Sequence, residues 1–177
     1  MKYLLTIFLI TNILISMFSQ NQINMYPTQA PITGKENHHN KATPYEALIE
    51  FYDAFNHRKM DLMANNWANT PGIAMDNPLG GIKRGWGPIK AVYQRIFEGQ
   101  AEVYVEFFDY TIHQQGEVFY AVGRERGHFE VSGHRIPLAI RTSRIFQKLD
   151  GEWKQVHHHG SIEDPALLKS YQDLVRQ

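Results

Sequence analysis

The 177-residue sequence contains no cysteine. This absence excludes disulfide bonds, thiolate zinc sites, iron–sulfur clusters, a cysteine nucleophile and a lipid anchor on an N-terminal cysteine. Any chemistry must therefore come from histidine, carboxylate, arginine, tyrosine and serine side chains. Histidine is the unusual part of the composition, since the chain has nine histidines and three of them are consecutive.

The sequence also lacks an excess of charge of either sign. Its 18 Lys and Arg residues balance 18 Asp and Glu residues, and its pI is near 7.1. Binding to a phosphate backbone scales with the number of phosphates that a protein neutralises, so this balance argues against nucleic acid as a partner. The sequence has no glycine-rich phosphate loop, nucleophile elbow or His-Glu-x-x-His pattern, and phosphoryl transfer, serine hydrolysis and helical zinc proteolysis lose their usual support.

The first 42 residues predict two segments ahead of a single folded domain. Residues 1–19 begin with Lys2 and continue as an apolar run, which is typical of an export signal. The run is short for a permanent membrane span, which needs about 20 apolar residues, but its poor cleavage site leaves an uncleaved signal anchor open. Residues 20–42 are polar without an apolar period, so we expect a disordered linker. We expect the folded domain over residues 43–177, in a periplasmic or secreted protein.

The domain shows helical signals first and strand signals afterwards. Thr43-Pro44-Tyr45-Glu46 is a capping box with proline at the first helical position, which predicts a helix start. Apolar spacing predicts further helices around residues 61–67, after Gly87-Pro88 and after Asp164-Pro165. Alternating patterns and turn signals predict a short strand at 73–76 and four antiparallel strands at 103–112, 118–131, 136–146 and 153–162. This order favours an α+β fold in which helices pack on one face of a curved antiparallel sheet and enclose a cavity.

The three consecutive histidines fall on the last predicted strand. Because side chains alternate across a strand, His157 and His159 should share the inner face, while His158 points the other way. A metal site would need a third ligand, which Asp76, Glu130 or His128 could supply. The more common role is hydrogen bonding in a polar cavity wall, so we expect neither a metal nor a cofactor.

Two arginines are predicted on the inner faces of the central strands. Arg124 and Arg144 alternate with apolar residues, and a buried guanidinium keeps its charge at any working pH. Each arginine therefore pairs with a protein carboxylate such as Glu130 or waits for an anionic ligand. The pattern leaves these two alternatives open.

Three further residues are candidates for the cavity. Asp76, at the end of the short strand, could act as a general base, although an Asp-Asn-Pro sequence more often caps its own turn. Tyr52 and Trp67 could contact a ligand, but aromatic residues at helical spacing usually pack in the core.

Two parts of the chain resemble a known family. Residues 48–56 read LIEFYDAFN and residues 75–81 read MDNPLGG, and both are similar to SnoaL-like proteins of the nuclear transport factor 2-like superfamily. Residues 141–161, RTSRIFQKLDGEWKQVHHHGS, resemble the closing hairpin of SnoaL-like proteins and of the association domain of calcium/calmodulin-dependent protein kinase II. The likeness covers roughly residues 43 to 165.

The resemblance implies a cone-shaped fold with a deep pocket, commonly dimeric through the outer face of the sheet. It also implies that Arg144, and less directly Arg124, bind small carboxylates, as pocket arginines do in the association domain. In steroid isomerases of this superfamily the catalytic carboxylate immediately precedes the proline. Here Asn77 holds that position and Asp76 lies one residue earlier, which argues against this chemistry.

Three hypotheses about function follow. The leading one is an exported protein that binds a small polar or carboxylate-bearing organic molecule, anchored by Arg144 and Arg124 and hydrogen-bonded by His157 and His159. The second is a cofactor-independent acid–base enzyme of the isomerase, dehydratase or cyclase type, in which Asp76 and a histidine share proton transfer. The third is a non-catalytic module that forms homodimers or larger homo-oligomers.

Overall fold

A six-stranded mixed sheet forms the body of the protein. In this computed structural model, residues 29–37 and 42–175 are described. The strand order is β2-β1-β6-β5-β4-β3. The strands are β1 (Ala74–Asp76), β2 (Ile82–Arg84), β3 (Glu102–Gln115), β4 (Val118–Val131), β5 (His134–Leu149) and β6 (Glu152–Ser161). Neighbours from β3 to β6 are antiparallel, which confirms the expected four-stranded meander, whereas β1 joins β6 in parallel and the short β2 was not expected.

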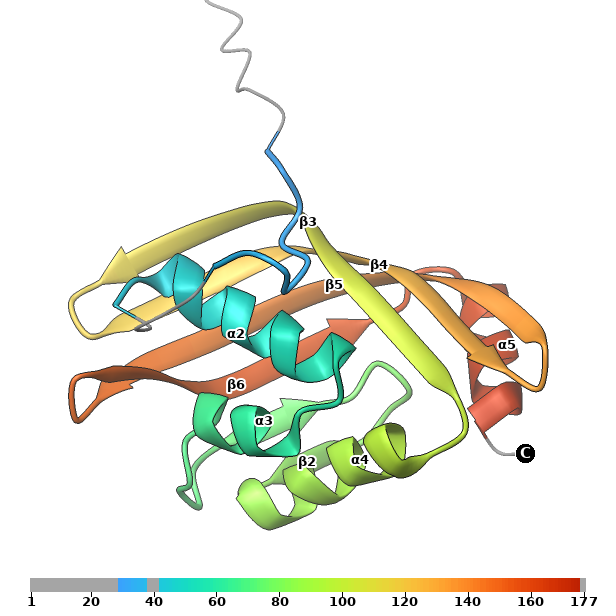
Figure 1. Cartoon of the computed structure of the whole chain (residues 1–177), viewed down its shortest axis with the longest axis horizontal. Helices are drawn as coiled ribbons and strands as arrows, with labels where there is room; N and C mark the ends of the chain where they lie inside the picture. Colours follow the sequence, from blue (N-terminus) through green and yellow to red (C-terminus); the bar gives the residue numbers. More distant parts are fainter. Residues whose placement is uncertain (1–28, 38–41, 176–177) are drawn as a thin grey trace, which may run out of the picture.

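Within the described residues, four helices accompany the sheet, as the apolar spacing predicts. They are α2 (Pro44–Asn56), α3 (Met60–Asn66), α4 (Trp86–Glu98) and α5 (Pro165–Val175). The capping box at the start of α2 is formed, since Glu46 N donates to Thr43 Oγ1 at 3.2 Å and Thr43 N donates to Glu46 Oε2 at 3.0 Å. Helix α2 lies across the sheet, and α3 and α4 lie beside it. Helix α5 lies near the end of β4 and the start of β5 (Figure 1). The α+β class is confirmed.

The inner face of β4 carries the opposite set of residues from the one expected. Phe119, Ala121 and Glu125 are buried, whereas Val118, Tyr120 and Val122 are each more than 40% exposed. Arg124 alternates with the exposed set and lies on the outer face, so its predicted inner position is wrong. Both sets of β4 residues are apolar at the start of the strand, so period-two alternation alone could not choose between the faces.

A β-bulge in β6 reverses the expected orientation of the histidines. Ile145 pairs with His157, and the next residue, Phe146, pairs with Gln155, so Val156 is an extra residue in β6. Gln155 and His158 are therefore both buried on the inner face. His157 and His159 lie on the outer face, and the sequence prediction for the three histidines is wrong by one residue.

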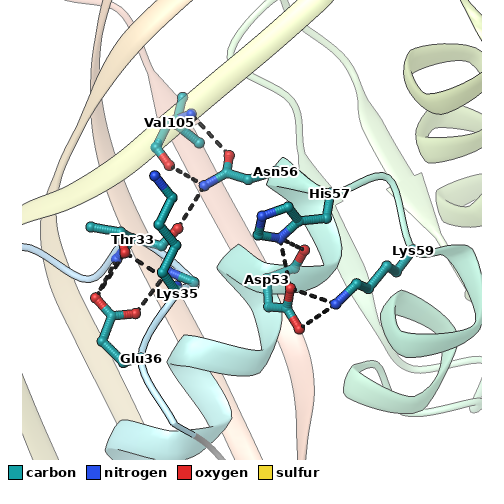
Figure 2. A network of polar contacts seen from close by, with 9 residues as sticks. Thr33, Lys35, Glu36, Asp53, Asn56, His57, Lys59 and Val105 are labelled. Atoms are coloured by element: carbon teal, nitrogen blue, oxygen red, sulfur yellow. Dashed lines mark hydrogen bonds and ion pairs between the residues drawn. The ribbon is translucent and has the colours of Figure 1, made fainter.

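Residues 29–37 pack onto the domain, where the sequence led us to expect a disordered linker. Ile32 is completely buried and exchanges two backbone hydrogen bonds with Phe107 at the edge strand β3, at 3.0 and 2.9 Å. The Asn56 side chain donates to the Thr33 carbonyl at 2.9 Å and to the Val105 carbonyl at 2.8 Å, joining the segment to α2 and β3 (Figure 2). One apolar side chain, backbone pairing with β3 and the bond from Asn56 hold this segment, and none of these leaves a periodic pattern in the sequence.

The remaining predictions for the N-terminal part fall outside the described residues. These are the export signal at 1–19 and the parts of the expected linker at 20–28 and 38–41. Within residues 29–37 and 42–175, no helix is long and apolar enough to cross a membrane.

Candidate functional site

An internal cavity of about 350 Å³ lies between the helices and the inner face of the sheet. Helices α2, α4 and α5 contribute mainly apolar side chains to its lining, among them Phe51, Phe55, Val92, Ile96 and Leu174. Three polar side chains enter the lining from three neighbouring strands, namely Glu125 from β4, Arg144 from β5 and His158 from β6. The cavity therefore combines a mostly apolar lining with a polar wall on the sheet, as small-molecule sites do.

Glu125 and Arg144 form a buried ion pair in this wall. Arg144 Nη2 donates to Glu125 Oε1 at 2.7 Å, and the two side chains are 1% and 6% exposed. Arg144 Nη1 also donates to Gln155 Oε1 at 3.1 Å, and the guanidinium carbon lies 3.4 Å from the centre of the Phe51 ring. The hydroxyl of Tyr52 donates to Glu125 Oε1 at 2.8 Å. The sequence left open whether Arg144 pairs with a protein carboxylate or binds an anionic ligand. In the structure it pairs with a protein carboxylate.

The partner of Arg144 is Glu125 and not Glu130, the carboxylate suggested by the sequence. Glu130 lies near Arg135, with 3.6 Å between the charged atoms. The sequence signal that could have identified Glu125 is its spacing from the large apolar residue Phe119, three alternations earlier on the same strand face.

His158 is the polar group of the wall that the sequence analysis missed. It is 7% exposed, and neither ring nitrogen has a hydrogen-bond partner among the described residues. Burial lowers the pKa of His158 well below its ordinary value, and the positive charge of Arg144 adds to this effect. The imidazole is therefore neutral near pH 7, with one nitrogen able to donate and the other able to accept. Only knowledge of the bulge at Val156 could have placed it here.

Tyr93 stands close to the same wall on α4. Its side chain is buried, and burial raises the pKa of its phenol to about 12. Tyr93 therefore keeps its proton throughout the physiological range and can serve as a neutral hydrogen-bond donor.

Several predicted site residues lie elsewhere. Tyr52 and Trp67 are 0% and 2% exposed, but neither is among the residues that line the cavity, and Tyr52 acts through Glu125. Arg124, on the outer face, bonds to Asp109 through its Nε at 3.2 Å and is about half exposed. His157 lies on the outer face as well.

Asp76 and His159 do meet, but outside the cavity. The two residues are paired in register between β1 and β6, and His159 Nδ1 lies 3.3 Å from Asp76 Oδ2. The side chains are 30% and 49% exposed, and neither lines the cavity. Asn77 lines the cavity instead, and it also caps the following turn by accepting a bond from Leu79 N at 2.8 Å. An acid–base pair of Asp76 and His159 therefore has no access to a molecule in the cavity.

Three side chains of a type that binds metal do not converge anywhere within residues 29–37 and 42–175. His128, one of the suggested third ligands, is instead bonded to Glu102 through its Nε2 at 3.1 Å and to Arg135 through its Nδ1 at 2.9 Å.

Solved structures share the fold. A proposed calcium/calmodulin-dependent protein kinase type II association domain from Thiobacillus denitrificans is 23% identical, with a TM-score of 0.58, and the match covers 73% of this chain and 100% of that chain. A proposed dehydratase of the nuclear transport factor 2-like family from Streptomyces avermitilis is 20% identical, with a TM-score of 0.57 and coverage of 65% and 89%. The association domain of the C. elegans kinase is 19% identical, with a TM-score of 0.50 and coverage of 62% and 85%. Likenesses at these low identities show the fold alone.

No curated protein matches this chain. A family model described as the SnoaL-like domain matches residues 45–165, which is the stretch from the first turn of α2 to the start of α5. The cone of helices on a curved sheet, the internal cavity and this match agree with one another, and the chain belongs to the SnoaL-like family.

Proposed function

We propose that the internal cavity binds a small organic molecule with a mostly apolar body and one polar group, and that the polar group bonds to His158. The observation that carries this proposal is the neutral imidazole of His158, which lies in the cavity wall with two ring nitrogens that no described residue engages. A buried polar group without a partner costs free energy, and a bound molecule that hydrogen-bonds to it removes that cost.

The remaining lining supports an apolar body for the ligand. Phe51, Phe55, Val105, Leu138 and Ile140 come from α2 and the sheet and surround the space next to the polar wall. A cavity of about 350 Å³ falls within the usual size of small-molecule sites. The enzymatic alternative that uses Asp76 and His159 gains no support, because this pair lies outside the cavity.

The proposal is tested with two probes of the same shape, 2-naphthol and naphthalene. In the wild type, 2-naphthol should raise the Tm more than naphthalene at equal concentration, because only the naphthol can hydrogen-bond to His158. In His158→Phe this difference should disappear, while some stabilisation by naphthalene remains. His157→Phe is the matched control on the outer face of the same strand, and it should behave as the wild type does.

The proposal fails if neither probe stabilises the wild type, or if His158→Phe still prefers the naphthol. Chemical shifts of the His158 ring protons provide a second readout. They should move on addition of 2-naphthol, and those of His157 should not.

We also propose that the protein forms homodimers through the outer face of the sheet. Exposed apolar side chains gather there on β4, namely Val118, Tyr120 and Val122. Two of the similar solved structures are named as association domains, which supports a second copy of the chain as the partner. Export remains a proposal that rests on residues 1–19 alone.

A further inference from the structure

Glu125 and Arg144 both line the cavity, so their charges decide which ligands can enter. We propose that Glu125 is the specificity-determining residue of the cavity: it acts as an internal counter-ion to Arg144 and thereby restricts the cavity to uncharged ligands. This inference rests on the proposed function, because it concerns the ligand of the same cavity. It changes the expectation from the sequence, in which Arg144 would anchor a carboxylate.

The guanidinium of Arg144 is already engaged by the protein. Its Nη2 is bound to Glu125, its Nη1 is bound to Gln155, and the Phe51 ring covers one face of the guanidinium. Of the guanidinium nitrogens, only Nε is buried without a hydrogen-bond partner among the described residues. A carboxylate binds arginine best through two parallel N–H groups, so a ligand carboxylate would have to share Nη2 with Glu125 or Nη1 with Gln155.

The charge of Glu125 also repels an anionic ligand. Arg144 and Glu125 are 1% and 6% exposed, so solvent screens their charges poorly. A ligand carboxylate near Arg144 would also stand near Glu125, and two carboxylates in one buried site repel each other strongly. The Tyr52 hydroxyl holds Glu125 in place by donating to Oε1, so the counter-ion cannot swing away without losing that bond.

The other groups that face this pair do not supply a compensating positive charge. Gln155 and Tyr93 are uncharged, and His158 is neutral near pH 7 for the reason given above. Arg95 also lines the cavity, but it is solvent-exposed at the last turn of α4, where water and salt screen its charge. An anion deep in the cavity would therefore lose its hydration without gaining an unpaired cation.

The experiment compares 2-naphthol with 2-naphthoate, which is the same apolar body carrying a carboxylate. The wild type should bind 2-naphthol about tenfold more tightly than 2-naphthoate, or more, in isothermal titration calorimetry at pH 7. In Glu125→Gln the amide keeps the shape of the side chain and can still accept from Tyr52 and Arg144, but the negative charge is lost. Affinity for 2-naphthoate should then rise about tenfold or more, and the ratio of the two affinities should shift toward 2-naphthoate by a similar factor.

Glu130→Gln is the matched control. It removes one negative charge from the same strand, near Arg135, outside the residues that line the cavity. It should leave the binding of both probes unchanged, which separates the local counter-ion effect from a change in net charge.

A second variant, which removes the positive charge of the pair, keeps the proposal testable if Glu125→Gln does not fold. Arg144→Gln leaves the Glu125 charge alone in the wall, so this variant should gain affinity for protonated 2-naphthylmethylamine and not for 2-naphthoate. The comparison of the three probes on the wild type needs no variant at all and should rank 2-naphthol first.

The outcomes separate the two proposals. If the wild type binds 2-naphthoate at least as tightly as 2-naphthol, the counter-ion role is wrong and the proposed binding function stands. An unchanged affinity of folded Glu125→Gln for 2-naphthoate also overturns the role of Glu125. If the wild type binds none of the probes, the proposed function fails and this inference fails with it.

Discussion

Single residues in the cavity wall meet the demands of burial in two different ways. Arg144 is buried and fully charged, and Glu125, Gln155 and Phe51 together compensate it. His158 has no such partners and instead remains neutral, because the free energy of burying its charged form is too high. Two basic side chains that are direct cross-strand neighbours therefore differ in charge at pH 7.

The neutral state of His158 predicts a pH dependence of stability. In the unfolded chain a histidine has a pKa near 6.5, whereas the pKa of folded His158 lies well below that value. Below pH 6.5 the unfolded state takes up a proton that the folded state does not, so the free energy of unfolding falls as the pH falls. Between pH 7.5 and 5.5 this one group should remove about 1.4 kcal/mol of stability.

Urea unfolding at the two pH values measures this loss. His158→Phe should lose about 1.4 kcal/mol less than the wild type over the interval, because phenylalanine does not titrate. Equal losses in the wild type and in His158→Phe would mean that His158 is accessible to protons in the folded state.

At the scale of elements, the strands show what an alternating pattern can and cannot predict. The bounds of β4 agree with the prediction at Val118 and Val131, because turn residues flank the strand. The predicted inner face of β4 was wrong, because residues 118–122 are apolar on both faces of the strand and the pattern does not favour either face. In β6 the pattern was clear, but one extra residue at Val156 moved His158 inward. Bulges depend on pairing between strands, which single-strand periodicity does not contain.

The N-terminal segment predicts a second effect on stability. Ile32 is completely buried and pairs with Phe107, so Ile32→Ala should leave a cavity and destabilise the protein by about 3 kcal/mol. The measurement is the urea midpoint of the full chain. Ile82→Ala is the matched control, because Ile82 is 52% exposed on β2, and it should change the stability by less than about 0.5 kcal/mol.

The docking of this segment also restricts one backbone position. Gly34 has a φ of 81°, and a Cβ atom there would clash with the backbone nitrogen of Asp53 on α2. If Ile32→Ala and Ile82→Ala have the same free energy of unfolding, residues 29–37 do not stabilise the domain in solution. They would then behave as a linker.

At the scale of the whole molecule, the architecture could be predicted because its signals are local. The capping box at Thr43, the turns between the strands and the Asp164 cap each mark a boundary, and Asp164 Oδ1 does accept a bond from Ala166 N at 2.8 Å. The candidate site could not be predicted to the same degree. It joins Glu125, Arg144 and His158 from three strands. If the inner face of a strand is assigned one residue out of register, the predicted site residue is the sequence neighbour of the real one.

The outer face of β4 is apolar and is predicted to form a dimer interface. In a monomer, Val118, Tyr120 and Val122 would leave an apolar patch in water, whereas a second copy would cover it through a two-fold interface. Tyr120→Glu places a charge on this patch twice per dimer, so it should shift the protein to monomers in sedimentation equilibrium. Since Tyr120 is 46% exposed, the fold itself should survive, which circular dichroism checks.

Tyr45→Glu is the matched control for the assembly. Tyr45 is 39% exposed in the first turn of α2, which covers the other face of the sheet, so this variant should remain a dimer. A monomeric wild type would exclude the interface altogether, and a dimeric Tyr120→Glu would move it to another surface. The expected result would give the ambiguity of β4 a physical cause. Helices would bury the inner face of the strand and a second copy its outer face, so both faces need apolar residues. The sequence of such a strand loses the alternation that distinguishes its inner face from its outer face.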